Sequence, residues 1–207
     1  MKRLLMAFAA CGALAFAQYK VEATGEAPAE VAAPIKELLA PAGHKVMSGD
    51  GKVWCEVWFV KAAPKGPDST EADLMWKTAP PGSVIGTIRW HEGGYDRRGQ
   101  VLKPGVYTLR FSMFPLNGDH QGVAPNRDFL VMTPAAEDQS AAAVPKFDDL
   151  MKMSRKASGT PHPAVLAMYV VESDFQPGIQ NVGEDWNLFA KVGETPIGLT
   201  VVGKSEH

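Results

Sequence analysis

The residues best suited to chemistry lie in one polar stretch, residues 117–122, with the sequence Asn-Gly-Asp-His-Gln-Gly. Carboxylate oxygen and imidazole nitrogen are common ligands of divalent metal ions, so Asp119 and His120 could bind one. Adjacent side chains in an extended loop point apart, and further ligands would have to come from elsewhere, with His91 and His162 as candidates. The same composition is typical of a turn whose polar side chains hydrogen-bond their own backbone, and we favour that interpretation.

His91 and His162, the two assisting candidates, each have a second interpretation. His91 is followed by Glu92, and a neutral imidazole beside a carboxylate can act as a general base. His162 lies between two prolines, where it could be presented to a site or be an exposed residue of a connector. Asp128 is a further carboxylate that could join them as a metal ligand.

No motif with the spacing of an established site supports these candidates. The chain has no HxH, HxxxH or CxxC pair, no calcium loop, and no nucleophile elbow, Walker loop or dinucleotide fingerprint. A metal-dependent or acid–base enzyme centred on Asp119 and His120, with a divalent metal ion as its cofactor, is therefore the alternative to a non-catalytic protein.

Five tryptophans provide a third class of function, carbohydrate binding. An exposed indole ring on a β-sheet protein can stack on a sugar. Core packing explains the same rings, because the strands around them are strongly apolar, and we favour it. Trp54 and Trp58 lie in an expected strand, whereas Trp76 lies in a long connection and could act as a lid or a plug. These three are the candidate ligand-binding residues.

Length and net charge limit the number of domains and the kinds of partner that we expect. The chain has 207 residues, of which 21 are Lys or Arg and 23 are Asp or Glu, for a formal net charge of −2. This length predicts one domain. A near-neutral balance without a basic block predicts no nucleic-acid partner.

The N-terminus has the pattern of a secretory signal. Two basic residues precede an apolar run from Leu4 to Ala15, and residues 15–17 have the small-x-small form that signal peptidase accepts. We therefore expect residues 1–17 to be removed and the protein to be periplasmic or extracellular. The apolar run is too short for a stable membrane span, and no later segment qualifies. The less favoured alternative is a lipid anchor on Cys11.

The sequence has two cysteines, and removal of the signal would take away Cys11 and leave Cys55 alone. A single cysteine forms no intrachain disulfide, so stability must come from a packed core. Cys55 itself is interpreted as a small buried hydrophobe rather than a reactive thiol.

The remaining pattern predicts a mainly β protein. Residues 18–34 are rich in Ala and Pro and predict an extended lead-in to a single domain at 35–207. Asp50-Gly51 between two apolar runs predicts a hairpin, whose second strand is apolar on both faces, as in a covered central strand. Further strands are expected at 83–90, 106–114, 128–132, 165–171, 186–192 and 197–203.

One amphipathic helix is expected near 145–158. It begins with Pro145, has acids in its first turn and bases in its last, and stops at Gly159. Eight or nine short strands with Gly/Pro turns and one inserted helix indicate an antiparallel β-sandwich of jelly-roll type.

Several motifs resemble those of a family of exported bacterial β-sandwich proteins of unknown function. They are the strand entry Lys-Pro-Gly-Val-Tyr-Thr-Leu at 103–109, the segment 118–130, Asp-Trp-Asn-Leu at 185–188 and the closing strand at 198–203. The resemblance covers most of residues 35–204. It implies export and a sandwich, and it implies no activity or site.

Together these observations favour an exported, non-catalytic β-sandwich that acts as a binding or interaction module. Its partner, whether small molecule, glycan or protein, and its oligomeric state are left open.

Overall fold

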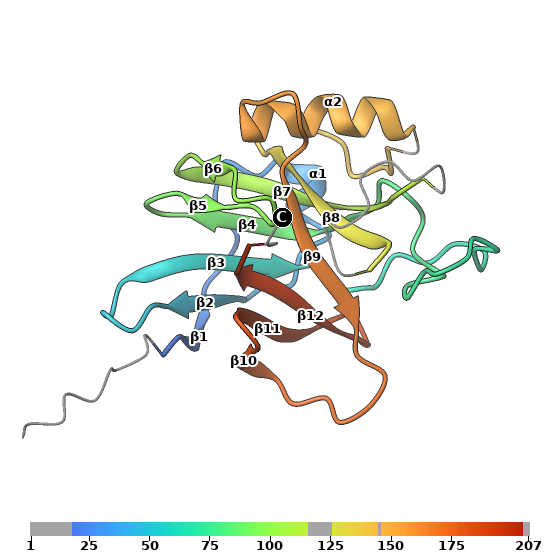
Figure 1. Cartoon of the computed structure of the whole chain (residues 1–207). Coiled ribbons are helices and arrows are strands. Elements are labelled where there is room, and N and C mark those ends of the chain that lie inside the picture. Colours follow the sequence, from blue (N-terminus) through green and yellow to red (C-terminus); the bar gives the residue numbers. More distant parts are fainter. Residues whose placement is uncertain (1–17, 116–125, 145, 205–207) are drawn as a thin grey trace, which may run out of the picture.

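A computed structural model describes residues 18–115, 126–144 and 146–204 of the chain (Figure 1). Within these ranges the chain forms twelve strands and two helices. Ten strands form one antiparallel sheet in the order β1-β2-β3-β4-β7-β8-β9-β12-β11-β10. Their bounds are β1 Lys20–Thr24, β2 Gly43–Met47, β3 Val53–Phe59, β4 Val84–Trp90, β7 Gly105–Met113, β8 Asp128–Pro134, β9 Val165–Val170, β10 Gly178–Val182, β11 Asp185–Val192 and β12 Thr195–Val202.

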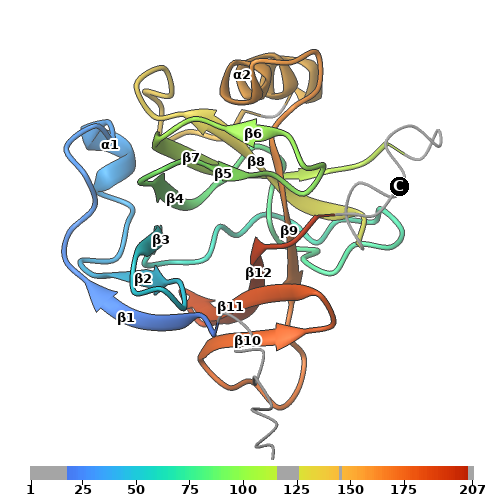
Figure 2. The ribbon, with the colours of Figure 1, turned by 60° about the vertical axis from the view of Figure 1, so that its left-hand side comes forward.

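The large sheet curls into a nearly closed barrel. Its two end strands, β1 and β10, contact each other, although among the described strands β1 hydrogen-bonds only with β2 and β10 only with β11 (Figure 2). Strand twist gives a single sheet this curvature, so its concave face can enclose a core alone. The mainly β, antiparallel class is confirmed. The sandwich of two stacked sheets is not confirmed, and the expected count of eight or nine strands is too low.

The barrel interior holds the main apolar core. Register partners share a face, and so do residues two apart on one strand, so five residues from different strands lie together on the inner face: Val57, Ile88, Leu109, Leu166 and Leu199. All five side chains are buried. Burial of apolar surface on this scale is the dominant stabilising contribution in a domain without a disulfide.

Parts of the outer face of the barrel are buried as well. Helix α2, Phe147–Ser158, covers β8, where Leu150 and Met151 pack with Phe129 and Val131 (Figure 1). On β3 the Trp58 indole points outward and donates a hydrogen bond to the carbonyl of Gly25 in the N-terminal segment, at 2.7 Å. This double cover explains why β3 is buried along almost its whole length, as its two-sided apolar pattern predicts.

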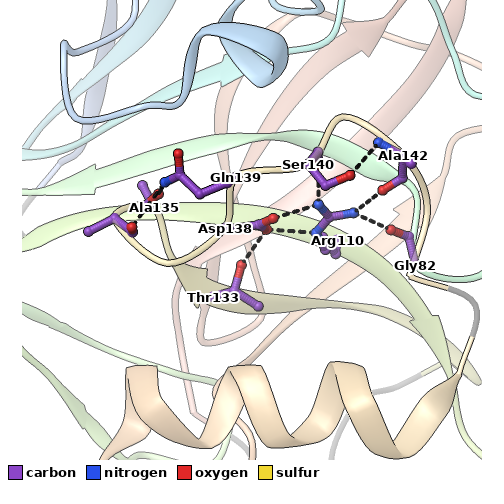
Figure 3. A network of polar contacts seen from close by, with 9 residues as sticks. Gly82, Arg110, Thr133, Ala135, Asp138, Gln139, Ser140 and Ala142 are labelled. Carbon is purple, nitrogen blue, oxygen red and sulfur yellow. Dashed lines mark hydrogen bonds and ion pairs between the residues drawn. The ribbon is translucent and has the colours of Figure 1, made fainter.

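A buried ion pair fixes the loop that follows β8. Arg110 on β7 and Asp138 in the loop are 0% and 1% exposed, and two hydrogen bonds of 2.6 Å join them. The guanidinium also donates to the carbonyls of Gly82, Ser140 and Ala142 (Figure 3). Every N–H of Arg110 is thereby used, so the residue serves the fold rather than a ligand.

The expected helix and hairpin are present. Helix α2 ends at Gly159, which adopts a left-handed conformation with φ 67°. Four strands lacked a clear signal in the sequence. They are β1, within the lead-in, β10, whose surface is mostly exposed, and the two-residue strands β5, Gly94–Tyr95, and β6, Val101–Leu102, which form a separate hairpin. The short helix α1 spans Ala33–Lys36. Among the described residues, neither helix is long and apolar enough to cross a membrane.

Candidate binding groove at one end of the barrel

Three segments far apart in the sequence meet at one end of the barrel. They are the start of β1, the β2–β3 turn with the first residues of β3, and the loop after β4, which lie beside one another because β1 to β4 are consecutive in the sheet (Figure 1). A groove of about 270 Å³ opens between them. Its lining consists of Tyr19, Ser48, Gly49, Asp50, Lys52, Val53, Trp54, Glu92 and Gly93.

The hairpin turn gives one wall of the groove a fixed shape. The Ser48 backbone N–H donates to the Lys52 carbonyl, and the Gly51 N–H donates to the Ser48 carbonyl, both at 2.9 Å. Gly51 has φ 83°, a left-handed conformation that a residue with a side chain adopts only with strain. The Asp-Gly pair therefore positions Ser48 and Asp50 at the rim.

Trp54 is a half-buried aromatic platform within this groove. Its indole Nε1 donates to the Val201 carbonyl of β12 at 2.9 Å, across the barrel mouth. The ring meets Trp90 edge-on at 5.7 Å between centroids, and Tyr19 at 6.0 Å. A ring held on two sides and by its nitrogen loses little further freedom when a ligand contacts its remaining surface.

Tyr19 is the second aromatic residue of the groove, and it is also half-buried. Its ring lies 5.3 Å from that of Trp186, at the start of β11, so it bridges the two ends of the curled sheet. Burial first, and more weakly the nearby Asp50 carboxylate, raise the pKa of the Tyr19 phenol. The hydroxyl therefore stays protonated at neutral pH and can donate a hydrogen bond.

The polar rim carries a carboxylate with a free oxygen. Oδ1 of Asp50 accepts a hydrogen bond from the Ser48 hydroxyl at 2.5 Å and from the Lys52 backbone N–H at 3.4 Å. These contacts, the Ser48 bond first, hold the pKa of Asp50 below its usual range. Oδ2 accepts nothing from the part of the chain that the structure describes. Lys52 and Glu92, which also line the groove, form an exposed pair, with Nζ and Oε2 3.5 Å apart.

His91 is paired with a different carboxylate from the one beside it in the sequence. Its Nε2 lies 2.9 Å from Oε2 of Glu56 on β3, whereas Glu92 faces Lys52. The nearly buried Glu56 also accepts from the Thr24 hydroxyl at 2.6 Å, and Arg89 lies 3.7 Å away. Burial opposes ionisation of Glu56, but these hydrogen bonds and the neighbouring positive charges outweigh it and lower its pKa. The cluster ties β1, β3 and β4 together.

The metal candidates are not brought together where the structure describes them. His162 is exposed in the connector after α2, and Asp128 is buried, accepting the backbone N–H groups of Met75 and Trp76. Within residues 18–115, 126–144 and 146–204, no three His, Cys, Asp or Glu side chains form a metal-binding group. Asp119 and His120 lie outside the described residues, so a site centred on them stays a prediction.

The three candidate tryptophans differ in their surroundings. Trp58 is 1% exposed and Trp76 is 4% exposed, so neither offers a ring face to a ligand in this structure. The Trp76 ring packs edge-on against Phe111, 6.1 Å away, and belongs to the core. Trp54 alone of the three lines a groove. Sequence reasoning missed its partners Tyr19 and Asp50. Tyr19 lies in the expected lead-in, and the hairpin turn already accounts for an Asp at position 50.

A larger groove, of about 380 Å³, lies between the start of β7 and the end of α2. Two of its polar groups are engaged: the Tyr107 hydroxyl donates to the Lys103 carbonyl at 2.8 Å, and Lys156 is paired with Glu137. This groove has one aromatic residue in its lining, whereas the groove at Trp54 has two, Tyr19 and Trp54.

Comparisons of the chain with family models, with curated proteins and with solved structures found no match.

Proposed function

We propose that this protein is an exported, non-catalytic binding module and that its ligand site is the groove at the barrel mouth. The observation that carries the proposal is Trp54, a half-buried ring held by a hydrogen bond to Val201 and lining a groove that has the exposed Asp50 carboxylate on its rim. Mostly apolar concavities with a few placed polar groups are the usual form of small-molecule sites.

The chemistry of the lining supports binding rather than catalysis. The described lining contains two carboxylates, a lysine and hydroxyl groups, and it contains no imidazole or thiol. Asp50 is held ionised by Ser48, which suits a hydrogen-bond acceptor better than a proton donor. His91, the nearest candidate for a general base in sequence, pairs with Glu56 and is not one of the residues that line the groove.

Export is part of the proposal, and it rests on the signal pattern of residues 1–17. Mass spectrometry of the protein isolated from its cell tests it. The expected mature chain begins at Gln18 and carries no lipid. A chain that begins at a lipidated Cys11, or one that retains Met1, would overturn this part.

A thermal-shift screen tests the binding function. The protein purified after export is heated in the presence of neutral sugars, uronic acids, amino acids, nucleotides, fatty acids and divalent metal ions, one class at a time. We expect at least one class to raise the melting temperature, and we expect Trp54→Ala to remove that shift. Tyr95→Ala is the matched control, because Tyr95 is an exposed aromatic outside the groove, 42% exposed beneath Lys204. Shifts that survive Trp54→Ala, or no shift in any class, would contradict the proposal.

A further inference from the structure

We propose that the groove at the barrel mouth recognises a neutral saccharide. This inference rests on the proposed binding function and narrows it to one class of ligand. Three properties of the groove lead to it: the pair of aromatic rings, the type of hydrogen-bonding groups on the rim, and the sign of the charge there.

The aromatic pair suits the faces of sugar rings. A pyranose presents C–H groups on its faces and hydroxyl groups around its edge, so it packs on an aromatic ring and hydrogen-bonds sideways. Trp54 and Tyr19 are inclined at 73° to each other, and both line the groove. Both rings are partly buried, which fixes their position before a ligand arrives, and large aromatic side chains contribute contact area with little loss of freedom.

The rim supplies the partners that sugar hydroxyls need. Oδ2 of Asp50 can accept from a hydroxyl, and the Glu92 carboxylate and the Lys52 ammonium add a second acceptor and a donor. The protonated Tyr19 phenol can donate as well. Hydrogen bonds to ionised groups are about twice as strong as neutral ones, so a single carboxylate contributes much of the orientation of a polyhydroxylated ligand.

The charge at the rim distinguishes neutral sugars from acidic ones. The charged residues of the lining are Asp50 and Glu92, both negative, and Lys52, which is positive, so the lining carries one net negative charge. A uronate placed on the two rings would bring a third carboxylate beside Asp50, and like charges at that range repel each other. The groove volume of about 270 Å³ suits the end of a short chain.

Titration with defined oligosaccharides tests the inference. The probes are cellotetraose, xylotetraose, mannotetraose, galactotetraose and chitotetraose, with tetragalacturonate as the acidic comparison, followed by calorimetry and by tryptophan fluorescence. We expect at least one neutral probe to bind with a change in fluorescence, because Trp54 is at the contact, and we expect tetragalacturonate to bind at least about tenfold more weakly.

Variants locate the binding. Asp50→Asn keeps the shape of an exposed side chain and removes its charge. We expect this variant to bind the neutral probe about tenfold more weakly. Asp68→Asn, at an exposed position in the connection between β3 and β4, is the matched control and should leave affinity unchanged. Tyr19→Ala and Trp54→Ala should abolish binding. Asp50→Asn keeps the test decisive if Trp54→Ala fails to fold.

The outcomes separate this inference from the proposed function. If no neutral probe binds, or if one binds equally well to Asp50→Asn and Tyr19→Ala, the saccharide inference is wrong. If a non-sugar class raises the melting temperature only when Trp54 is intact, the proposed binding function is supported and the saccharide inference is wrong. Binding of tetragalacturonate as tight as that of the neutral probe would overturn the argument from charge.

Discussion

Replacement of Arg110 by methionine is the most informative test of how this barrel holds its covering loop. Arg110 on β7 is fully buried and forms five hydrogen bonds, two of them to Asp138. Methionine matches the apolar stem in length and removes the charge. Among the described residues, the variant leaves the buried Asp138 side chain with one partner, the Thr133 hydroxyl at 2.8 Å, and it removes the guanidinium donor from three carbonyl groups.

The expected cost is large because the partner charge stays in a dry environment. Removing one member of a buried ion pair destabilises a protein by about 3–5 kcal/mol. The carbonyls of Ser140 and Ala142 belong to residues exposed at the surface, so water can replace the guanidinium there and limit the cost to that range. For a protein of this size the loss corresponds to a fall in melting temperature of about 6–20 °C.

Urea denaturation followed by tryptophan fluorescence measures the change. Arg110→Met/Asp138→Leu removes both charges and should be less destabilised than the sum of its single variants, since neither charge is left unpaired. Lys191→Met is the control, because Lys191 and Glu194 form an exposed pair whose loss should cost at most about 1 kcal/mol. If the free energy of unfolding of Arg110→Met lies within about 1 kcal/mol of that of the native protein, the reasoning is refuted.

Three further predictions concern single side chains of the barrel. Burial raises the pKa of the Cys55 thiol, so iodoacetamide should leave Cys55 unmodified in the native protein and alkylate it in urea, and mass spectrometry that finds rapid native alkylation would contradict this. Since the folded pKa of Glu56 is lowered, its contribution to stability is present above the unfolded pKa and is lost as pH falls through the folded pKa; Glu56→Gln should therefore flatten the stability profile on the acid side, and an unchanged acid slope would count against the cluster. Trp76→Ala should cost about 3–5 kcal/mol in urea denaturation, because the 4% exposed ring packs against Phe111, whereas a loss below about 1 kcal/mol would indicate a surface role for the ring.

Local patterns in the sequence predict most of the elements of this fold. The Asp50-Gly51 turn, the two-sided apolar strand that follows it and the helix that ends at Gly159 all depend on neighbours within a few residues. The closure of the sheet does not depend on such near neighbours. It depends on β1 and β10 reaching each other, and both are short strands with largely exposed surfaces, which leave little hydrophobic alternation to detect. An interior lined by one curled sheet and an interior between two sheets give the same alternation along each strand.

The candidate groove is harder still to predict, because no local pattern contains it. His91 illustrates the difficulty: its carboxylate partner is Glu56, 35 residues earlier, and not the adjacent Glu92. Trp54 could be named from its residue type, but its exposure depends on what covers each face of β3. Trp58, four residues later on the same strand, is buried beneath the N-terminal segment at Gly25, whereas Trp54 meets the Tyr19 ring of that segment and stays partly exposed.

The groove and the closure of the barrel depend on the same residue. Tyr19 contacts Trp54 on β3 and Trp186 on β11, so one ring forms a wall of the groove and also joins the first strands of the sheet to the last. Trp54 adds a second link through its hydrogen bond to Val201 on β12. Because the described β1 and β10 share no hydrogen-bonded ladder, these side chains supply the connection at this end of the seam. The shape of the groove is therefore set by how the barrel closes, and not by the hairpin turn alone.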